Sequence, residues 1–402
     1  MMALPGVYEK IRDGGLGIVP PAASGLFAVV GPARSGTVNK LVYLSDPASA
    51  KDEFSEGLLV EHLQDAFACG ASQVVAVRTG ESVLAAISPI THTGTGTAAT
   101  SAGGTPRNTR DFVIEITEDG TVNLDGTVSG GKYRLSKNGG RTFEAEQPFP
   151  ANGQVDLGNG VSVTFGPVDA TTPGTLVKGD TYSLSTTEAM PTTQEVLDAV
   201  SAVLDGEPEV RFVVVVPATD SAVWASLDGL ASENFTSKHT PVFMLATRGL
   251  DTEDPSTFTD NAQTDMNAFS SVWLAVVASW AWVPDTFSGM WKRSAVGCIA
   301  GAIARREPHE SIGWVRYGVL PRVLEPVPAL TDTQLQQLEE SGHSLLRVWP
   351  GYGAAPVSGR TAAPGTSDFK FLEVRRIVNE AVRAVRAAAV PFVNAPGDEA
   401  GL

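Results

Sequence analysis

The feature that most constrains the fold of this chain is an alternation of apolar strands and helices that stops near residue 88 and resumes after residue 191. Before the interruption, residues 25–30 and 73–78 have the composition of buried strands, and residues 48–69 have the period of an amphipathic helix. After it, residues 193–204 predict a helix and residues 212–216 an apolar strand typical of a parallel sheet. Further helices and strands are predicted at residues 220–232, 242–246, 258–269 and 271–283. We therefore predict an α/β (α+β) core built from both ends of the chain, residues 21–88 plus 192–402.

The interrupting segment, residues 89–191, is predicted to be an inserted all-β domain. Residues 88–106 are rich in Thr, Gly, Ala and Ser, a composition typical of a flexible linker. Short strands are expected at residues 112–117, 161–165 and 181–185. Residues 133–136 and 141–143 flank Lys137, Asn138, Gly139 and Gly140, and an Asn-Gly pair tolerates the positive φ of a tight hairpin.

Composition limits the classes of partner. The chain has 402 residues, of which 43% are hydrophobic and 18% charged, which indicates a globular protein of more than one domain. Its formal net charge is −16, and this argues against nucleic acid as a partner, because binding to phosphates needs an excess of clustered Lys and Arg. Identical copies would repel one another, so self-assembly would need local complementarity.

Cysteine usage and hydropathy indicate a soluble protein that is intracellular when made. Cys69 and Cys298 both lie in apolar surroundings, which predicts buried free thiols and a reducing compartment. No signal peptide is predicted, and the most apolar run, residues 272–283, is too short to span a bilayer, so we expect no direct membrane insertion. The tryptophans at positions 273, 280 and 282 are interpreted as core residues rather than as a carbohydrate platform.

No catalytic, cofactor or metal site is predicted. Residues 31–36 have the glycine spacing of a phosphate-binding loop, but Thr37 stands where the lysine should be, so a turn is favoured. The histidines at 62, 92, 239, 309 and 343 have no neighbours at metal-ligand spacing. The acidic cluster of Asp251, Glu253 and Asp254 is interpreted as a solvated loop that leads into a helix.

Residues 351–386 form a Gly-rich turn, an extended piece around Arg360, and one long helix. Five apolar residues of that helix fall near helical spacing on one side: Leu372, Ile377, Ala381, Val385 and Ala388. Four arginines spread over the remainder: Arg375, Arg376, Arg383 and Arg386. The pattern predicts a basic surface on an acidic protein. It is either an ordinary solvated face, partly neutralised by Glu373 and Glu380, or a docking surface.

Residues 1–20 are predicted to be an N-terminal arm. Six residues in it alternate between apolar and charged as a strand does: Val7, Tyr8, Glu9, Lys10, Ile11 and Arg12. Asp13, Gly14 and Gly15 end this strand. A strand without a local partner joins either a distant edge of its own fold or the sheet of a neighbouring molecule.

Four stretches of the chain, taken together, resemble the contractile-tail sheath proteins of bacteriophages and of related injection machines. They are the LPGVY at residues 4–8, the SAVGCIAGAIARR at residues 294–306 with Trp314 after it, residues 335–348, and residues 351–386. The order and spacing of these stretches carry the resemblance, which covers roughly the first tenth and the last quarter of the chain.

This resemblance implies a structural protein of a virion tail. Copies would assemble in the host bacterial cytoplasm as helical rings around a tail tube, and contraction would drive the tube through the host cell envelope for genome ejection. The implied partners are further copies of the chain, the tail tube protein, and baseplate and tail terminator proteins, with no cofactor and no nucleic acid. The four arginines would dock on an acidic strip of the tube, residues 7–12 would add a strand to a neighbour, and the inserted domain would face outward.

Two alternatives stay open at this point. One is another virion tail, baseplate or receptor-binding component, and the other is an α/β enzyme with an accessory β domain. Sheath relatives also continue well past residue 394 to supply a C-terminal arm, whereas this chain stops at Leu402. The expectation of strand exchange therefore depends on the N-terminal arm.

Overall fold

A central, mostly parallel sheet organises the protein, for which a computed structural model describes residues 25–207 and 209–390. Within these residues the sheet has seven strands in the order β2-β3-β1-β14-β15-β16-β20. In β1 (Phe27–Gly31), Ala28 lies opposite Val75 of β3 (Val74–Arg78) on one side and Val213 of β14 (Phe212–Thr219) on the other. Because β3 precedes the interruption and β14 follows it, the predicted α/β core built from both ends of the chain is confirmed.

The remaining strands of this sheet extend it to both edges. Three further parallel strands follow β14: β15 (Phe243–Arg248), β16 (Leu274–Val277) and β20 (His343–Ser344). At the opposite edge, β2 (Leu41–Leu44) pairs antiparallel with β3. The strands β1, β3, β14, β15 and β16 are apolar throughout most of their length because helices cover both faces of the sheet.

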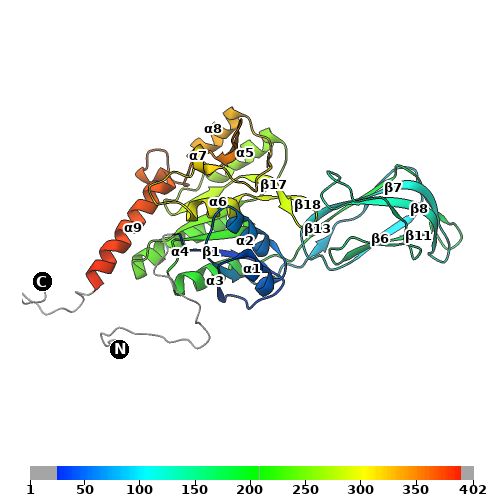
Figure 1. The fold of residues 1–402 in the computed structure, drawn as a ribbon, viewed down its shortest axis with the longest axis horizontal. Helices are drawn as coiled ribbons and strands as arrows, with labels where there is room; N and C mark the ends of the chain where they lie inside the picture. The colour runs from blue at the N-terminus through cyan, green and yellow to red at the C-terminus, as the bar shows by residue number, and fades with distance from the viewer. Residues whose placement is uncertain (1–24, 208, 391–402) are drawn as a thin grey trace, which may run out of the picture.

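Alternate residues of β1 belong to two different hydrophobic clusters. Val29 packs in a cluster with Leu63 and Ile299, and Val30 packs in a cluster with Val200 and Trp224. The first cluster is covered by α1 (Pro47–Phe54), α2 (Leu58–Ala68) and α6 (Val296–Ala304). The second is covered by α3 (Thr193–Asp205) and α4 (Ser221–Lys238). The core is therefore a three-layer α/β arrangement (Figure 1).

Smaller elements complete the core beyond β16. α5 (Pro255–Met266) and α8 (Asp332–Glu340) share a cluster that contains Phe258 and Leu338. An antiparallel sheet is formed by β17 (Trp280–Asp285), β18 (Gly289–Ser294) and β19 (Glu325–Val327). The rest of the chain forms α7 (Val315–Gly318), β21 (Leu346–Trp349), β22 (Gly353–Pro356), η1 (Asp368–Lys370) and α9 (Leu372–Ala389).

Residues 86–187, which we call the β-rich part, form sheets of their own. One sheet contains β4 (Ala86–Ile87), β13 (Thr181–Thr187), β7 (Arg110–Val122), β8 (Val128–Ser136) and β9 (Gln147–Pro148), with β5 (Thr91–Thr93) and β12 (Gly174–Leu176) beside it. The other contains β10 (Gln154–Asp156), β11 (Val161–Gly166) and β6 (Ala99–Gly104). Phe112, Ile114 and Ile116 of β7 alternate into the cluster between them. Figure 1 shows this part at the opposite end of the long axis from α9.

A buried set of charges joins the β-rich part to the core, and we call it the junction cluster. It consists of Glu61, Asp65, Arg110, Asp285, Arg293 and Arg322. Arg110 of β7 donates to Glu61 of α2 at 2.5 Å and to Asp285 of β17 at 3.2 Å. Arg293 of β18 holds Asp65 through Nε and Nη2 at 2.7 and 3.2 Å. Burial opposes the charge of Asp285, but Arg110 and the Ser288 hydroxyl outweigh it and hold the pKa of that carboxyl below its usual range.

Several predicted elements differ from the structure. Residues 48–69 form two helices rather than one, because Ser55 (φ 60°) and Gly57 (φ 118°) adopt left-handed backbone conformations between them. β2 was not predicted. Residues 271–283 contain β16 and the start of β17, which belong to different sheets.

Two predictions within the β-rich part were wrong. Residues 88–106 are not a flexible linker, since they supply β5 and β6, and β6 pairs along its whole length with β11. Residues 141–143 do not form the second strand of a hairpin. Gly139 and Gly140 do have the expected positive φ, but Asn138 is buried and its amide donates to Thr142 and to the Ser288 carbonyl, so the turn is tied to the core.

The acidic loop, two of the three tryptophans interpreted as core residues, and the two buried thiols agree with their predictions, whereas Trp280 is only partly buried. Asp254 caps α5, as the acidic loop before that helix suggested. Trp273 and Trp282 are buried. Cys69 and Cys298 are buried free thiols. Across the described residues, no helix is both long enough and apolar enough to cross a bilayer.

Candidate assembly surfaces

The predicted N-terminal strand lies outside the described residues. Val7, Tyr8, Glu9, Lys10, Ile11 and Arg12 all fall within residues 1–24, so their role stays a prediction.

The helix α9 packs on the core with the opposite face from the one expected. Its buried residues are Leu372, Arg375, Arg376, Asn379 and Arg383, spaced as one side of a helix. By contrast, Ile377 is 46% exposed and Val385 is 70% exposed. The expectation that the apolar side faces inward and the arginines face outward is therefore wrong, with two exceptions. Leu372 is buried as expected, and the side chain of Arg386 is 42% exposed.

Arg375 is buried between aromatic rings. Its guanidinium carbon lies 3.8 Å from the centroid of the Trp273 ring and 4.6 Å from that of Phe369. Its Nε donates to Asn379 Oδ1 at 2.8 Å, one helical turn further along. Burial lowers the pKa of Arg375 to about 10, so the group is still charged near neutral pH. Stacking on two rings favours a guanidinium here, because its flat face is weakly hydrated.

Arg376 caps the end of α6. Its Nη2 donates to the carbonyls of Ile303 and Arg306 at 3.2 and 2.5 Å, and its Nη1 donates to that of Glu307 at 3.1 Å. The last carbonyls of a helix lack partners within the helix and carry a partial negative charge, so a buried cation stabilises them. Burial lowers the pKa of Arg376 to about 10.

Arg383 and Arg386 fix the second half of α9 to the edge of the core. Arg383 Nη2 donates to the carbonyls of Val210 and Pro241 at 2.9 and 2.5 Å, just before β14 and β15 begin. Arg386 Nη1 donates to Glu209 Oε1 at 3.0 Å and to Thr240 Oγ1 at 2.8 Å. All four arginines therefore already have internal partners, and three of them are buried, so contact of this set with a tube stays a prediction.

A signal for this orientation is present in the sequence. Arg375, Asn379 and Arg383 follow one another at intervals of four, which places them on one helical face with Leu372. A polar face of this kind is buried when it meets unpaired backbone carbonyls, and those carbonyls belong to segments far away in the chain.

The inward position of the arginines leaves an apolar face exposed on α9. Ile377, Ala381, Val385 and Ala388 all lie on it, and Figure 1 shows the helix extending away from the core. Scattered exposed apolar residues are ordinary, but a stripe along one helix face is typical of a contact surface.

A second open surface is the small sheet of β21 and β22. These strands pair antiparallel from Leu346 opposite Pro356 to Trp349 opposite Gly353. Among the described residues, β21 pairs with β22 alone, although the Ala354 carbonyl of β22 accepts from Leu320 N. Val348 is 51% exposed and Tyr352 is 66% exposed. The Leu346 amide at the start of β21 donates to the Ser279 hydroxyl at 2.7 Å, and beyond it the edge of β21 has no strand partner among the described residues.

The loop with phosphate-loop spacing has its amides occupied. Ala33 N donates to Glu81 Oε1 at 2.9 Å, and Arg34 N and Ser35 N donate to the carbonyls of Glu56 and Phe54. This geometry is a turn held by internal acceptors rather than a phosphate cradle. Within the described residues, no group of three or more His, Cys, Asp and Glu side chains has the arrangement of a metal site.

Sequence comparison assigns the chain to a family. The model of the DUF2586 family, N-terminal domain, matches residues 4–355. The chain belongs to this family. No curated protein sequence matches this DUF2586 member.

Solved structures with the same fold include a sheath tail protein and chains of a baseplate and of a sheath complex. The sheath tail protein from Desulfitobacterium hafniense is 15% identical with a TM-score of 0.52, over 96% of this chain and 83% of that one. A chain of the anti-feeding prophage baseplate is 13% identical with a TM-score of 0.51, over 100% and 80%. A chain of a contracted PVC sheath complex, from an extracellular contractile injection system, is 11% identical with a TM-score of 0.51, over 100% and 78%. The DUF2586 chain therefore has the sheath-protein fold, as the resemblance implied.

Proposed function

We propose that this protein is the structural subunit of a contractile sheath, whose copies stack as helical rings around a tail tube. Contraction would drive the tube through the host cell envelope. The observation that carries the proposal is the likeness in fold to sheath proteins along 96% or more of the chain. The subunit would be assembled in the host bacterial cytoplasm and would work in the tail.

Subunits would be linked by strand exchange. The alternating residues 7–12 would add a strand to the edge of β21 in a neighbouring copy. Main-chain hydrogen bonds of such a strand tolerate different side chains and survive rotation of the core, so copies would stay connected while they slide past one another.

We further propose that α9 faces the tube and that the β-rich part faces outward. The position of these two parts at opposite ends of the molecule supports this orientation (Figure 1). In this arrangement Arg375, Arg376 and Arg383 hold the helix in place, and Arg386 with the exposed stripe through Ile377 and Val385 makes the contact.

The proposed role is mechanical rather than catalytic, and it requires no cofactor. The shared fold with structural sheath proteins and the occupied amides of residues 33–35 support this part of the proposal. Motion would come from repacking between two assemblies of one chain.

Electron microscopy of the purified protein tests the proposal. A sheath subunit at high concentration should form tubes of uniform diameter. A monodisperse monomer at the same concentration would contradict it. Closed rings without tubes would favour a baseplate component, which the likeness to a chain of the anti-feeding prophage baseplate makes the second candidate.

A further inference from the structure

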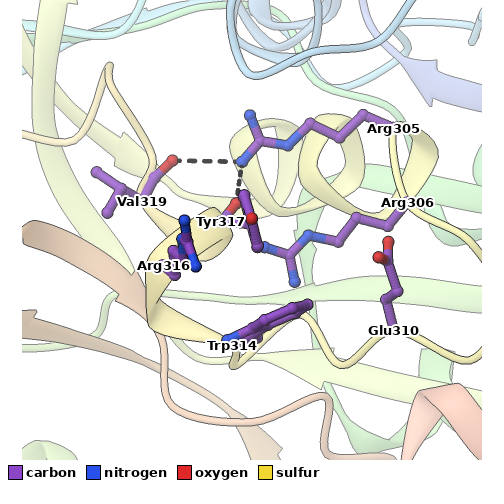
Figure 2. A pocket seen from close by; sticks show the side chains of 7 residues that line it. All are labelled: Arg305, Arg306, Glu310, Trp314, Arg316, Tyr317 and Val319. Carbon is purple, nitrogen blue, oxygen red and sulfur yellow. Dashed lines mark hydrogen bonds between the residues drawn. The ribbon is translucent and has the colours of Figure 1, made fainter.

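A basic and aromatic hollow lies beside the end of α6. It has a volume of about 450 Å³ and is lined by seven residues: Arg305, Arg306, Glu310, Trp314, Arg316, Tyr317 and Val319. Three arginines against one glutamate give it a local positive charge in a chain whose net charge is −16. Figure 2 shows Arg305 and Arg306 extending from the helix towards Tyr317 and Trp314.

Two of its arginines are partly engaged by backbone carbonyls. Arg305 Nη2 donates to the carbonyls of Tyr317 and Val319 at 2.5 and 3.5 Å. Arg306 Nη1 donates to the Ser311 carbonyl. These bonds fix the two guanidinium groups without neutralising them, because carbonyls carry no net charge.

One edge of the Arg306 guanidinium group, formed by Nε and Nη2, has no hydrogen-bond partner among the described residues. The residue is nevertheless only 5% exposed. Elsewhere in the chain, the same Nε and Nη2 edge holds a carboxylate: Arg293 binds Asp65 this way, and Arg134 binds Glu115. Burial and the neighbouring Arg305 lower the pKa of Arg306, so an added negative charge would stabilise its ionised form.

The carboxylate of Glu310, which also lines the hollow, does not pair with Nε and Nη2 of Arg306. Glu310 Oε2 accepts from the Glu307 amide at 3.2 Å, and no ion pair joins Glu310 to Arg306 within the described part of the chain. Arg316 is exposed, and its guanidinium carbon lies 5.3 Å from the centroid of the Tyr317 ring. Trp314 and Tyr317 are each 50% exposed, and their rings contact each other edge to face at 4.7 Å between centroids.

We propose that this hollow binds an aspartate or glutamate side chain from a second copy of the chain. Arginines with tryptophan and tyrosine are the residues that dominate binding energy at protein interfaces, and a forked guanidinium pairs best with a carboxylate. A second copy is the favoured source because a chain of net charge −16 presents many carboxylates to its neighbours, and copies can associate only where that charge is locally offset. The proposal rests on the proposed function, since it requires copies to assemble.

Charge reversal at the exposed arginine tests this contact. Sedimentation of the full chain over a concentration series should show self-association, and Arg316→Glu should weaken it at least tenfold, whereas Arg316→Lys should weaken it much less. Arg34→Glu is the matched control, because Arg34 is an exposed arginine on the loop after β1. Arg316 and Arg34 are both exposed, so the thermal unfolding midpoint should be unchanged in all three variants.

The outcomes separate the two proposals. Self-association that Arg316→Glu leaves unchanged, or that Arg34→Glu weakens equally, overturns the carboxylate site and leaves the sheath proposal standing. Absence of self-association in the unaltered chain overturns both.

Cross-linking identifies the occupant. With p-benzoylphenylalanine in place of Trp314 and a mixture of ¹⁵N-labelled and unlabelled protein, mass spectrometry should find a mixed-isotope cross-link to a peptide that contains Asp or Glu. Cross-links confined to peptides of the same copy would refute the assignment.

Discussion

Arg110 of β7 and Glu61 of α2 meet at 2.5 Å in a site from which water is nearly excluded, and this ion pair ties the β-rich part to the core. The arginine side chain is 2% exposed and the glutamate side chain 14% exposed. Asp285 and Arg293 continue the network into β17 and β18. Two parts of the chain that fold around separate hydrophobic clusters thus share one set of buried charges.

We expect Arg110→Ala to destabilise the protein by up to about 3–5 kcal/mol, because it leaves Glu61 and Asp285 buried with one shared cation, Arg293, in place of two. Urea unfolding followed by circular dichroism measures the change in midpoint. The control is Arg134→Ala on the neighbouring strand, which breaks a pair with Glu115 at a side chain that is 42% exposed. That change should cost less than about 1 kcal/mol, and equal effects of the two substitutions would show that the junction cluster adds nothing to stability.

Arg376→Met should destabilise the protein by about 1–3 kcal/mol, because it leaves buried carbonyls at the end of α6 without a donor. The adjacent Ile377→Ala should change stability by less than about 0.5 kcal/mol, since Ile377 is half exposed. Thermal or urea unfolding of both variants compares them. A larger loss for Ile377→Ala would mean that the face of α9 has been assigned wrongly.

Removal of residues 1–12 should leave a folded monomer that no longer polymerises, because the strand proposed to link neighbours is lost. Circular dichroism reports the fold and electron microscopy the polymers. Tubes of normal appearance from the shortened chain would remove strand exchange at this end.

Val385→Asp and Arg386→Glu should weaken co-sedimentation with the tube protein, because both side chains are substantially exposed. Val385→Asp should leave the unfolding curve nearly unchanged, and Arg386→Glu should cost about 1 kcal/mol, because it loses an exposed ion pair with Glu209. Arg383→Glu serves as a contrast. Its side chain donates to the Val210 and Pro241 carbonyls in a buried site, so its main effect should be on stability. Unaltered co-sedimentation by both exposed variants would exclude this part of α9 from the tube contact.

Glu188 should make stability depend on pH. Burial, followed by the charge of Glu61, raises the pKa of this carboxyl to about 7 from 4.5. The folded state therefore holds the proton of Glu188 more tightly than the unfolded state does. The resulting contribution to the free energy of unfolding is fully present below pH 4.5 and is lost as the pH rises through 7. This pKa shift corresponds to a change of roughly 3 kcal/mol in the free energy of unfolding. His62 acts in the opposite direction, since burial lowers its pKa to about 4, so its contribution is lost as the pH falls below 6.5.

Glu188→Gln should remove the decline in the free energy of unfolding between pH 4.5 and 7. The variant should therefore become more stable relative to the unaltered protein as the pH rises. Urea midpoints measured across this range give the difference. Glu195→Gln is the control, because hydrogen bonds from Thr192 and Ser82 lower the pKa of Glu195 to about 2, below the window. Parallel curves for the unaltered protein and Glu188→Gln would contradict the raised pKa.

The central sheet was predictable from sequence because its strands are buried on both faces. Val213, Val214 and Val215 lie in an uninterrupted apolar run, which a parallel sheet covered by helices requires. The strands β5 and β6 were not predictable, since Thr, Gly, Ala and Ser carry no periodic apolar signal and their pairing with β13 and β11 is set by distant residues.

The orientation of α9 was missed for a different physical reason. Its apolar residues suggest an inward face in isolation, but the core offers this helix unpaired carbonyls at Ile303, Val210 and Pro241. Arginines satisfy those groups, and valine cannot. Which face is buried therefore depended on backbone acceptors that only the folded chain brings together.

The pairing of β1 with both β3 and β14 means that the chain leaves and rejoins the central sheet on two strands that are separated by β1 alone. The β-rich part, which lies between those strands in the sequence, is in effect an insertion, whereas α3 after it belongs to the core. Another module with closely spaced ends could replace the β-rich part without shifting any register of the sheet. The replacement would have to supply a cation for Glu61 and Asp285, or those two acids would have to be neutralised with it. In the proposed sheath, the surface that the β-rich part presents could therefore change while the core fold stays the same.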